Sequence, residues 1–189
     1  MTSASLPEGV SNATTASDLA FGVPGSADAL RHVLGHFASG VAIATALHHG
    51  IKHAMTATAV CSVSLEPPLV LVCVSKSSRF HAAITKARCW CLSLLTADQE
   101  GLARHFSNRG RDLLSQFDRI SHIPSPLSGT PLIDGALGWL ECTTYGMHDG
   151  GDHTIVVGQL VRASGLPSDD DPNARPPLTY YRGAYFSGA

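Results

Sequence analysis

Short apolar and β-branched runs, each ending at a turn or a proline pair, recur along most of this chain. The run from Leu69 to Val74 follows Pro67-Pro68 and is too short and too branched for a helix, so it predicts a buried strand. The run from Val41 to Leu47 alternates larger residues with alanine and then meets His48-His49-Gly50. This pattern predicts a strand, a turn and an immediately returning strand. A chain patterned in this way is expected to be mainly β.

Similar runs predict further strands at residues 55–65, 90–95, 136–145 and 154–161, with one more short strand within 176–185. Three short helices are expected between them: one capped by Ser26 and stopped by Gly40, one at 81–87, and one opened by the capping box Thr96-Ala-Asp-Gln99. The first carries Leu30, Val33, Leu34 and Phe37 at helical spacing.

Strands with irregularly placed short helices, and without a regular βαβ alternation, favour a closed or partly closed antiparallel barrel. Neither G-x-G-x-x-G after a strand nor G-x-x-x-x-G-K-[ST] occurs in the chain. A nucleotide cofactor would therefore need another architecture to hold it.

The composition fits a single globular domain, with 44% apolar and 15% charged residues among 189. Residues 1–25 are rich in Ser, Ala, Thr, Gly and Pro without periodicity, so we expect a disordered tail there and one domain spanning 26–189. A formal net charge of -2 offers no broad field for nucleic acid or an anionic membrane surface. Small molecules are the expected partners.

The sequence also indicates a compartment. No apolar run approaches the roughly 20 residues of a spanning helix, and the first residues lack the basic and apolar regions of a secretory signal. We therefore expect a cytoplasmic protein. The five cysteines are odd in number and lie in apolar surroundings, which predicts reduced thiols buried in a core.

Two segments have compositions that could serve a ligand. Lys52 to Thr58 places small residues and hydroxyls where bulky branched residues are expected, so its backbone could approach a flat ring. Lys76-Ser-Ser-Arg79 precedes a helix and could hold a phosphate through hydroxyls, backbone N–H groups and a guanidinium. An ordinary strand with solvated hydroxyls and a capped helix with a basic loop are the alternatives.

The histidines give weaker evidence for a ligand or metal site than these two segments. His153 follows Gly150-Gly151-Asp152 where a turn enters a strand, so its imidazole could face a ligand or make a local hydrogen bond. His32 and His36 have the i, i+4 spacing of zinc ligands, but no third ligand accompanies them and no metal site is expected. The absence of G-x-S-x-G and of a cysteine-protease signature argues against a hydrolase.

Six phrases occur in order between about Ala29 and Tyr185. They are Leu34-Gly-His-Phe-Ala-Ser-Gly-Val41, Met55-Thr-Ala57, Ser62 to Val74, Asp98-Gln99 through Phe106, Gly151-Asp-His153, and Pro177-Leu-Thr-Tyr-Tyr-Arg-Gly183. Together they resemble the flavin reductase-like family, the small components of two-component flavin monooxygenases. The resemblance implies a split β-barrel that forms a homodimer. The chain departs from the common pattern at Thr58, Ser93 and His105, where Asn, Asn and Arg are frequent.

The same resemblance implies that a flavin, FMN or FAD, lies along the strand after the first hairpin. It assigns to the flavin Lys52, His53, Ala54, Met55, Thr56, Thr58, Ala59, Cys73, Val74, Ser75, Ser78, Arg79, Phe80, His105 and Phe106. The nicotinamide of NADH or NADPH would be received by His153, Tyr181, Arg182 and Gly183.

In such a protein the nicotinamide would stack on the flavin and pass hydride from its C4 to flavin N5. The protein then needs to orient two rings and requires no nucleophile or carboxylate pair. Reduced flavin would leave for a separate monooxygenase. Two alternatives stay open: a non-catalytic split-barrel protein that stores flavin or a related tetrapyrrole, and a barrel that keeps its flavin and acts directly on an organic substrate.

Overall fold

The computed structural model describes residues 25–164 and 175–187. The tail expected at residues 1–25 lies outside the described residues except for Gly25. The chain divides into two units, residues 1–37 and 38–189, which are described separately. No helix in the described part of the chain is long and apolar enough to cross a membrane.

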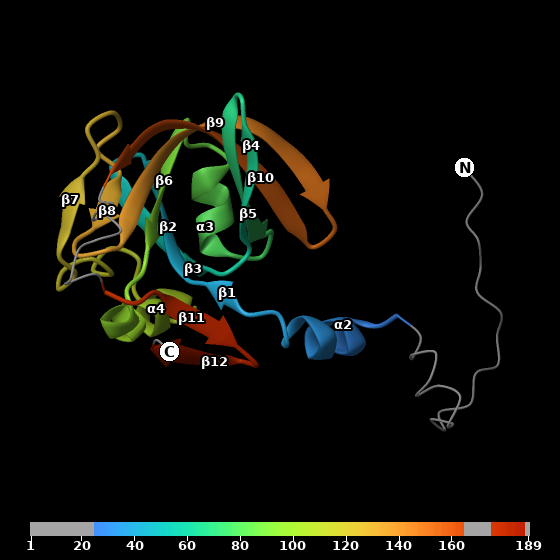
Figure 1. Cartoon of the computed structure of the whole chain (residues 1–189). Helices are drawn as coiled ribbons and strands as arrows, with labels where there is room; N and C mark the ends of the chain where they lie inside the picture. The colour runs from blue at the N-terminus through green and yellow to red at the C-terminus, as the bar shows by residue number, and fades with distance from the viewer. Residues whose placement is uncertain (1–24, 165–174, 188–189) are drawn as a thin grey trace, which may run out of the picture. The chain divides into compact units, whose positions relative to one another are not determined.

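Seven antiparallel strands form the main sheet of the second unit, in the order β3-β2-β6-β9-β10-β5-β4 (Figure 1). The strands are β2 (Ala42–His48), β3 (Ile51–Ala57), β4 (Val60–Leu65), β5 (Pro68–Ser75), β6 (Cys89–Leu94), β9 (Gly138–Gly150) and β10 (His153–Ser164). The helical segments of this unit are α3 (Arg79–Ile84), η1 (Ala97–Gln99) and α4 (Glu100–Ser107). The prediction of a mainly β chain with a few short helices is confirmed.

The alternation of alanine with larger residues in β2 has a structural reason, because both faces of this strand are buried. Ala42, Ala44 and Ala46 face one core cluster, which also holds the α3 residues Phe80 and Ile84. Small side chains on this face let the helix lie close to the strand. Ile43 faces a second cluster, in which the α4 residue Phe106 and the β11 residue Leu178 are buried.

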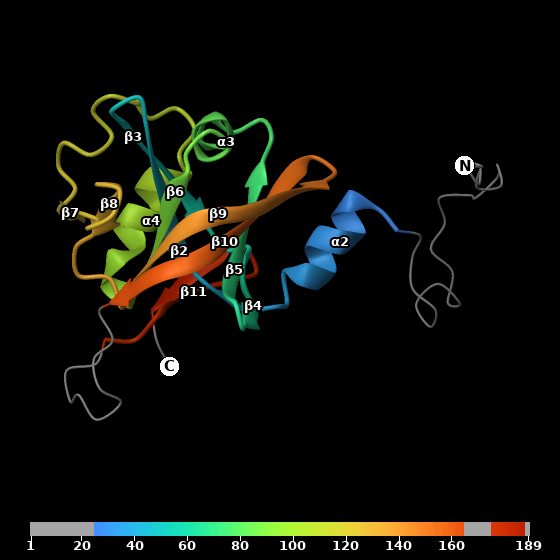
Figure 2. The same ribbon diagram turned by 90° about the horizontal axis from the view of Figure 1, so that it is seen from above.

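Helix α3 closes the curled sheet. It contacts β2 and β3 near one end of the strand order and β5 near the other (Figures 1 and 2). Phe80 and Ile84 are almost fully buried among Val72, Val74 and the fully buried Trp90. Strands that are far apart in the sheet order are thereby joined through one helix, as expected for an open barrel.

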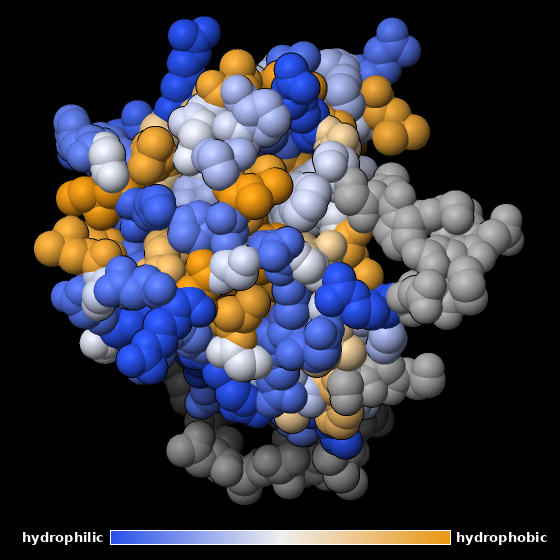
Figure 3. All heavy atoms as spheres, turned by 90° about the vertical axis from the view of Figure 1, so that its left-hand side faces the viewer, coloured by the Kyte–Doolittle hydropathy of each residue, from blue (hydrophilic) through white to orange (hydrophobic). Residues whose placement is uncertain are grey.

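Two smaller sheets complete the second unit. One contains β1 (Ser39–Gly40), β11 (Leu178–Tyr181) and β12 (Ala184–Ser187), and the other β7 (His122–Pro124) and β8 (Pro131–Ile133). The sequence predicted one strand within residues 176–185, which is wrong because a hairpin forms there. Arg182 and Gly183 both have positive φ, 50° and 80°, and so turn the chain within two residues. Polar and apolar side chains are interspersed over the face that carries β7 and β8 (Figure 3).

The first unit contains helix α2 (Ala27–Leu34). Ser26 caps it as predicted, with its hydroxyl accepting from the N–H of Ala29 at 3.1 Å. The helix ends at Gly35 and not at Gly40, because the Gly35 N–H closes the last turn onto the carbonyl of Arg31. None of the residues of α2 is buried.

All five cysteines are free thiols, as predicted, but they are not all buried. Cys91 and Cys142 lie in the core, where burial raises the pKa of the Cys142 thiol to about 12. Cys73 and Cys89 are half-buried, and Cys61 is exposed on the edge strand β4. The expectation of a fully buried set is therefore wrong, because a strand at the edge of a sheet leaves side chains to solvent.

Gly158 in β10 is the position where the barrel core leaves no room for a side chain. A Cβ there would overlap the indole of Trp90 and lie 2.8 Å from the Cβ of Cys142. We expect Gly158→Ala to lower the free energy of unfolding by about 1–3 kcal/mol, measured by chemical denaturation, because the core must shift. Gly101→Ala in α4 is the control, since that Cβ would meet open space. Equal stability of the Gly158 variant and the unmodified protein would contradict this packing.

Candidate functional site

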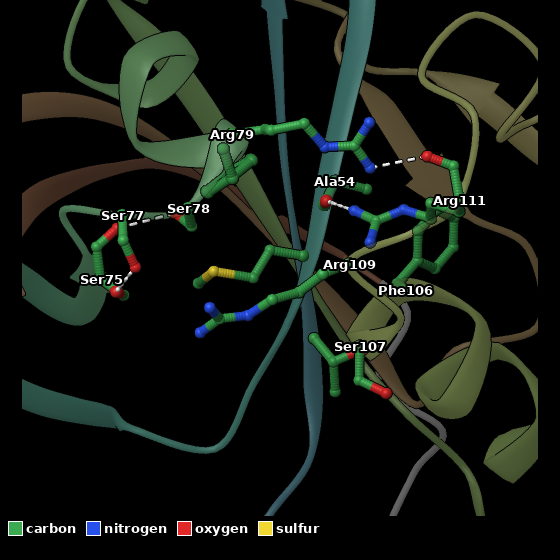
Figure 4. Close-up of a pocket in the computed structure, with 12 residues that line it drawn as sticks. Ala54, Ser75, Ser77, Ser78, Arg79, Phe106, Ser107, Arg109 and Arg111 are labelled. Atoms are coloured by element: carbon green, nitrogen blue, oxygen red, sulfur yellow. Dashed lines mark hydrogen bonds between the residues drawn. The ribbon is translucent and has the colours of Figure 1, made fainter.

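A pocket of about 270 Å³ opens between β3, the turn from β5 into α3, and the end of α4 (Figure 4). Its walls come from three segments that are far apart in the sequence. They are lined by Ala54, Met55, Thr56, Ser75, Ser77, Ser78, Arg79, Phe80, Phe106, Ser107, Arg109 and Arg111. Three of these side chains are guanidinium groups and none is a carboxylate, which makes the pocket suited to an anionic ligand.

The β3 wall consists of Ala54, Met55 and Thr56. Ala54 is buried, Met55 is half-buried, and the Thr56 hydroxyl donates to the carbonyl of Ala103 in α4 at 2.6 Å. Thr56 thus ties β3 to α4, while Phe106 of α4 supplies an aromatic wall. The unusual run of small residues in this strand leaves space for a flat ring between β3 and the helices.

The opposite wall carries hydroxyls. Ser78 caps α3, with its Oγ accepting from the N–H of His81 at 3.1 Å and donating to the carbonyl of Ser75 at 2.8 Å. The hydroxyls of Ser75 and Ser77 lie 3.0 Å apart. The Ser78 hydroxyl is therefore used in capping the helix, and the Ser77 hydroxyl beside the pocket is the one that can donate to an anion.

Arg111 is held by the protein itself. Its guanidinium donates to the carbonyls of Ala54 and Asn108 and to the side-chain oxygen of Gln116. It also lies over the ring of Phe106, with the two centres 5.5 Å apart. Burial, and then the charge of Arg79, lower the pKa of this guanidinium. Arg111 thus fastens the segment after α4 to β3.

Arg79 and Arg109 are the more accessible cations. Arg79 spans the pocket from α3, and one of its nitrogens donates to the carbonyl of Arg111 at 2.7 Å (Figure 4). Within the described part of the chain, no hydrogen bond or ion pair holds the guanidinium of Arg109. Both side chains are exposed and can meet a ligand from solvent.

His153 lies next to this pocket although it is distant in sequence. It starts β10 and pairs with Ser75 at the end of β5. Its Nδ1 is 2.7 Å from the Asp152 carboxylate, and this bond lowers the pKa of the Asp152 carboxyl. A carboxylate only accepts, so Nδ1 carries the proton and the imidazole is held in one orientation.

Lys76 fastens the His153 turn to the serine segment. Its ammonium donates to the carboxylate of Asp149 and to the carbonyl of Gly151, and its backbone N–H donates to the carbonyl of Asp152. The β9–β10 hairpin and the start of α3 are therefore positioned together.

The remaining nicotinamide candidates lie in another part of the fold. Tyr181, Arg182 and Gly183 form the β11–β12 turn and do not line the pocket. The hairpin that contains this turn contacts α4 through Tyr185 in β12. The centre of the Tyr185 ring lies 5.2 Å from the Arg104 guanidinium of α4. The terminal hairpin thus packs on the helix that supplies Phe106 and Ser107.

Of the fifteen predicted flavin residues, eight line the pocket: Ala54, Met55, Thr56, Ser75, Ser78, Arg79, Phe80 and Phe106. The other seven do not: Lys52, His53, Thr58, Ala59, Cys73, Val74 and His105. Val74 is fully buried in the barrel core, and the His105 Nε2 lies 2.9 Å from the carbonyl of Gln116. The roles of all fifteen stay predictions.

The sequence predicted Ser77 only as part of the segment Lys76-Ser-Ser-Arg79, and it did not predict Ser107, Arg109 and Arg111 as site residues. The signal was present in Asn108-Arg-Gly-Arg111, a basic turn directly after the capping-box helix. A basic loop alone is typical of solvated surface, so only its return toward β3 shows its relevance.

The comparisons with known proteins identify the family of this chain. Residues 34–189 match the model of the flavin reductase like domain. The NADH-dependent FAD reductase of Streptomyces globisporus is 41% identical over 140 residues, which cover 74% of this chain and 76% of that protein. The flavin-dependent monooxygenase reductase subunit HsaB of Mycobacterium tuberculosis is 36% identical, with 82% of this chain and 79% of that protein covered.

A solved structure gives the same result. The Streptomyces globisporus NADH:FAD oxidoreductase SgcE6, solved with NAD and FAD fragments, superposes with a TM-score of 0.77 at 37% identity. The match covers 86% of this chain and 92% of that chain. The family model spans most of this sequence, and the relatives align with this chain over most of their own length. This chain therefore belongs to the flavin reductase-like family.

Proposed function

We propose that this protein is an NAD(P)H-dependent flavin reductase that supplies reduced FMN or FAD to a partner monooxygenase. The observation that carries the proposal is the pocket itself. It combines Ala54 and Met55 of β3 with the hydroxyls and guanidinium groups of the other two segments. The relatives named as flavin reductases support the same assignment.

The residues present fit a flavin. A flat ring system requires small side chains and an aromatic or thioether wall, which β3 and Phe106 provide. A phosphate requires donors and positive charge, which the Ser77 hydroxyl and the Arg79 guanidinium provide at the start of α3. When bound, the flavin supplies the electron acceptor for the hydride of the dihydronicotinamide.

The chain's own contribution is positioning and charge. Lys76 holds the β9–β10 hairpin beside the serine segment, so His153 stands at the edge of the same pocket. We assign His153 to the nicotinamide, because its ring is held by Asp152 and is only half-exposed. Tyr181, Arg182 and Gly183 form the second half of the proposed nicotinamide site.

We further propose that the flavin dissociates after reduction and that the protein is a homodimer. Exposed Leu30, Val33 and Leu34 on α2, and exposed Val63 and Leu65 on the edge strand β4, supply apolar surface that a second copy would cover. The domain limits 26–189 and the cytoplasmic location stay predictions.

Turnover with free flavin tests the proposed function. Oxidation of NADH and NADPH, measured at 340 nm, should be fast with added FMN or FAD and near zero without them. Turnover should depend on added flavin because the reduced flavin leaves the site and must be replaced. No turnover with any combination would favour a flavin-storing protein, and turnover without added flavin would favour a barrel that keeps its cofactor.

Arg79→Ala should weaken flavin binding by about 1.5–3 kcal/mol, the range for a hydrogen bond to a charged group. Flavin fluorescence quenching measures the dissociation constant. Arg88→Ala is the matched control, because Arg88 is exposed near the end of α3 and lies outside the pocket. Unchanged affinity in the Arg79 variant would show that this guanidinium does not bind flavin and only donates to the Arg111 carbonyl in the loop after α4.

His153→Ala should raise KM for the nicotinamide or lower kcat while flavin affinity stays near that of the unmodified protein. The reason is that the imidazole is assigned to the hydride donor alone. His148→Ala in the same hairpin serves as control, because His148 is exposed and outside the pocket. A loss of flavin affinity in the His153 variant would place the nicotinamide site elsewhere.

A further inference from the structure

The loop after α4 covers the open edge of β3. In the described part of the chain β3 pairs only with β2, so the backbone groups on its other side have no strand partner. Two carbonyls of β3, those of Lys52 and Ala54, accept instead from the side chains of Gln116 and Arg111. Side chains of one loop thus take the place of a neighbouring strand along a wall of the pocket.

Gln116 has a partner for the donor and for the acceptor of its side-chain amide. Its Nε2 donates to the carbonyls of Lys52 at 2.8 Å and Leu113 at 3.0 Å, and its Oε1 accepts from Arg111 Nε at 2.9 Å. A guanidinium only donates and a carbonyl only accepts, so the amide is restricted to one orientation. The residue is 3% exposed and does not line the pocket. This amide is therefore fixed by protein groups alone.

Gln116 connects parts of the pocket that lie far apart in the sequence. Its partner Arg111 lines the pocket, lies over the ring of Phe106 and donates to the carbonyl of Ala54 (Figure 4). The backbone carbonyl of Gln116 is 2.9 Å from Nε2 of His105, the residue before Phe106. Gln116 therefore joins the β3 wall, the loop after α4 and the end of α4 without lining the pocket itself.

The same loop has a second attachment, which does not involve this amide. Phe117 is buried in the core cluster that contains Phe106, with the two ring centres 5.2 Å apart. Apolar burial is therefore expected to keep the loop on the fold when the Gln116 bonds are removed. What the bonds decide is the direction of the half-buried Arg111 guanidinium, because loss of the Gln116 oxygen leaves its Nε to turn toward another acceptor.

We propose that Gln116 is a positioning residue of this pocket, which determines flavin affinity by holding the Arg111 guanidinium against the β3 wall. The inference rests on the proposed flavin reductase function and adds to it a buried residue outside the pocket. The effect passes through Arg111, because Arg111 is the one hydrogen-bond partner of Gln116 in the described chain that lines the pocket.

The test compares Gln116→Met with the unmodified protein, because methionine has a similar length and offers neither the amide N–H nor the amide oxygen. The dissociation constants for FMN and FAD, measured by quenching of flavin fluorescence, should rise about tenfold, and KM for NADH at saturating flavin should change less than about twofold. Ser125→Ala is the matched control, because it removes a buried hydrogen bond to Glu141 outside the pocket. It should lower stability in chemical denaturation and leave both flavin affinities unchanged.

Two further variants follow the route through Arg111. Gln116→Glu keeps an oxygen for Arg111 Nε and loses the donor to Lys52, so its flavin affinities should stay within about threefold of those of the unmodified protein. In an Arg111→Ala background, Gln116→Met should weaken flavin binding less than about twofold further, because effects that share one route are not additive.

Unchanged flavin affinity in a folded Gln116→Met variant would overturn the inference, as would equal losses of affinity in the Gln116→Met and Ser125→Ala variants. Additive losses with Arg111→Ala, or a Gln116→Glu variant as weak as Gln116→Met, would show that Gln116 does not act through Arg111.

If Gln116→Met does not fold, Gln116→Asn repeats the comparison, because its amide is too short to reach both Lys52 and Arg111. Failure of this variant to fold as well would make Gln116 a residue of the fold alone and overturn the inference. Failure of the proposed function looks different, because the unmodified protein would then bind neither flavin or would oxidise no NADH with them.

Discussion

The packing of α3 against the inside of the curled sheet is the contact on which the site depends. Phe80 and Ile84 enter a core lined by the alanine face of β2 and by Val72 and Val74. Four strands separate β3 from β5 in the strand order, so these two strands are not neighbours within the sheet. Because α3 joins them, the small residues of β3 face the serines that precede the helix. The pocket is thus a consequence of how the barrel closes.

Two sets of hydrogen bonds, made by Lys76 and Arg111, position the edges of the pocket. Lys76 binds the β9–β10 turn to the residues before α3, which places His153 at the pocket edge. Arg111 binds the segment after α4 to the carbonyl of Ala54, which places Arg109 at the other edge. Both fastenings use charged donors on backbone carbonyls, and such bonds are stronger than those between neutral groups. The two edges are held in this way, while the pocket between them stays open.

This division explains how a small protein can handle two ligands with few charged residues. The core decides the spacing of the walls, and it tolerates little change at Gly158, where strand and indole touch. Several polar residues of the pocket, Ser77, Ser78 and Arg109 among them, lie on turns at the ends of strands and helices, where a substitution is expected to cost the core little.

The sequence by itself determined the local structure: the strand runs at Val41–Leu47 and Leu69–Val74, the Ser26 cap, the capping box at Thr96 and the ordered phrases of the family. These features depend on neighbouring residues, whose side-chain pattern is readable along the chain. The tertiary structure alone decided which candidates share one pocket. It placed Val74 in the core, split residues 176–185 into two strands, and returned Arg109 and Arg111 to β3 across more than fifty residues. Long-range contacts of this kind depend on how the sheet curls and where α3 fills it, and no local pattern encodes that closure.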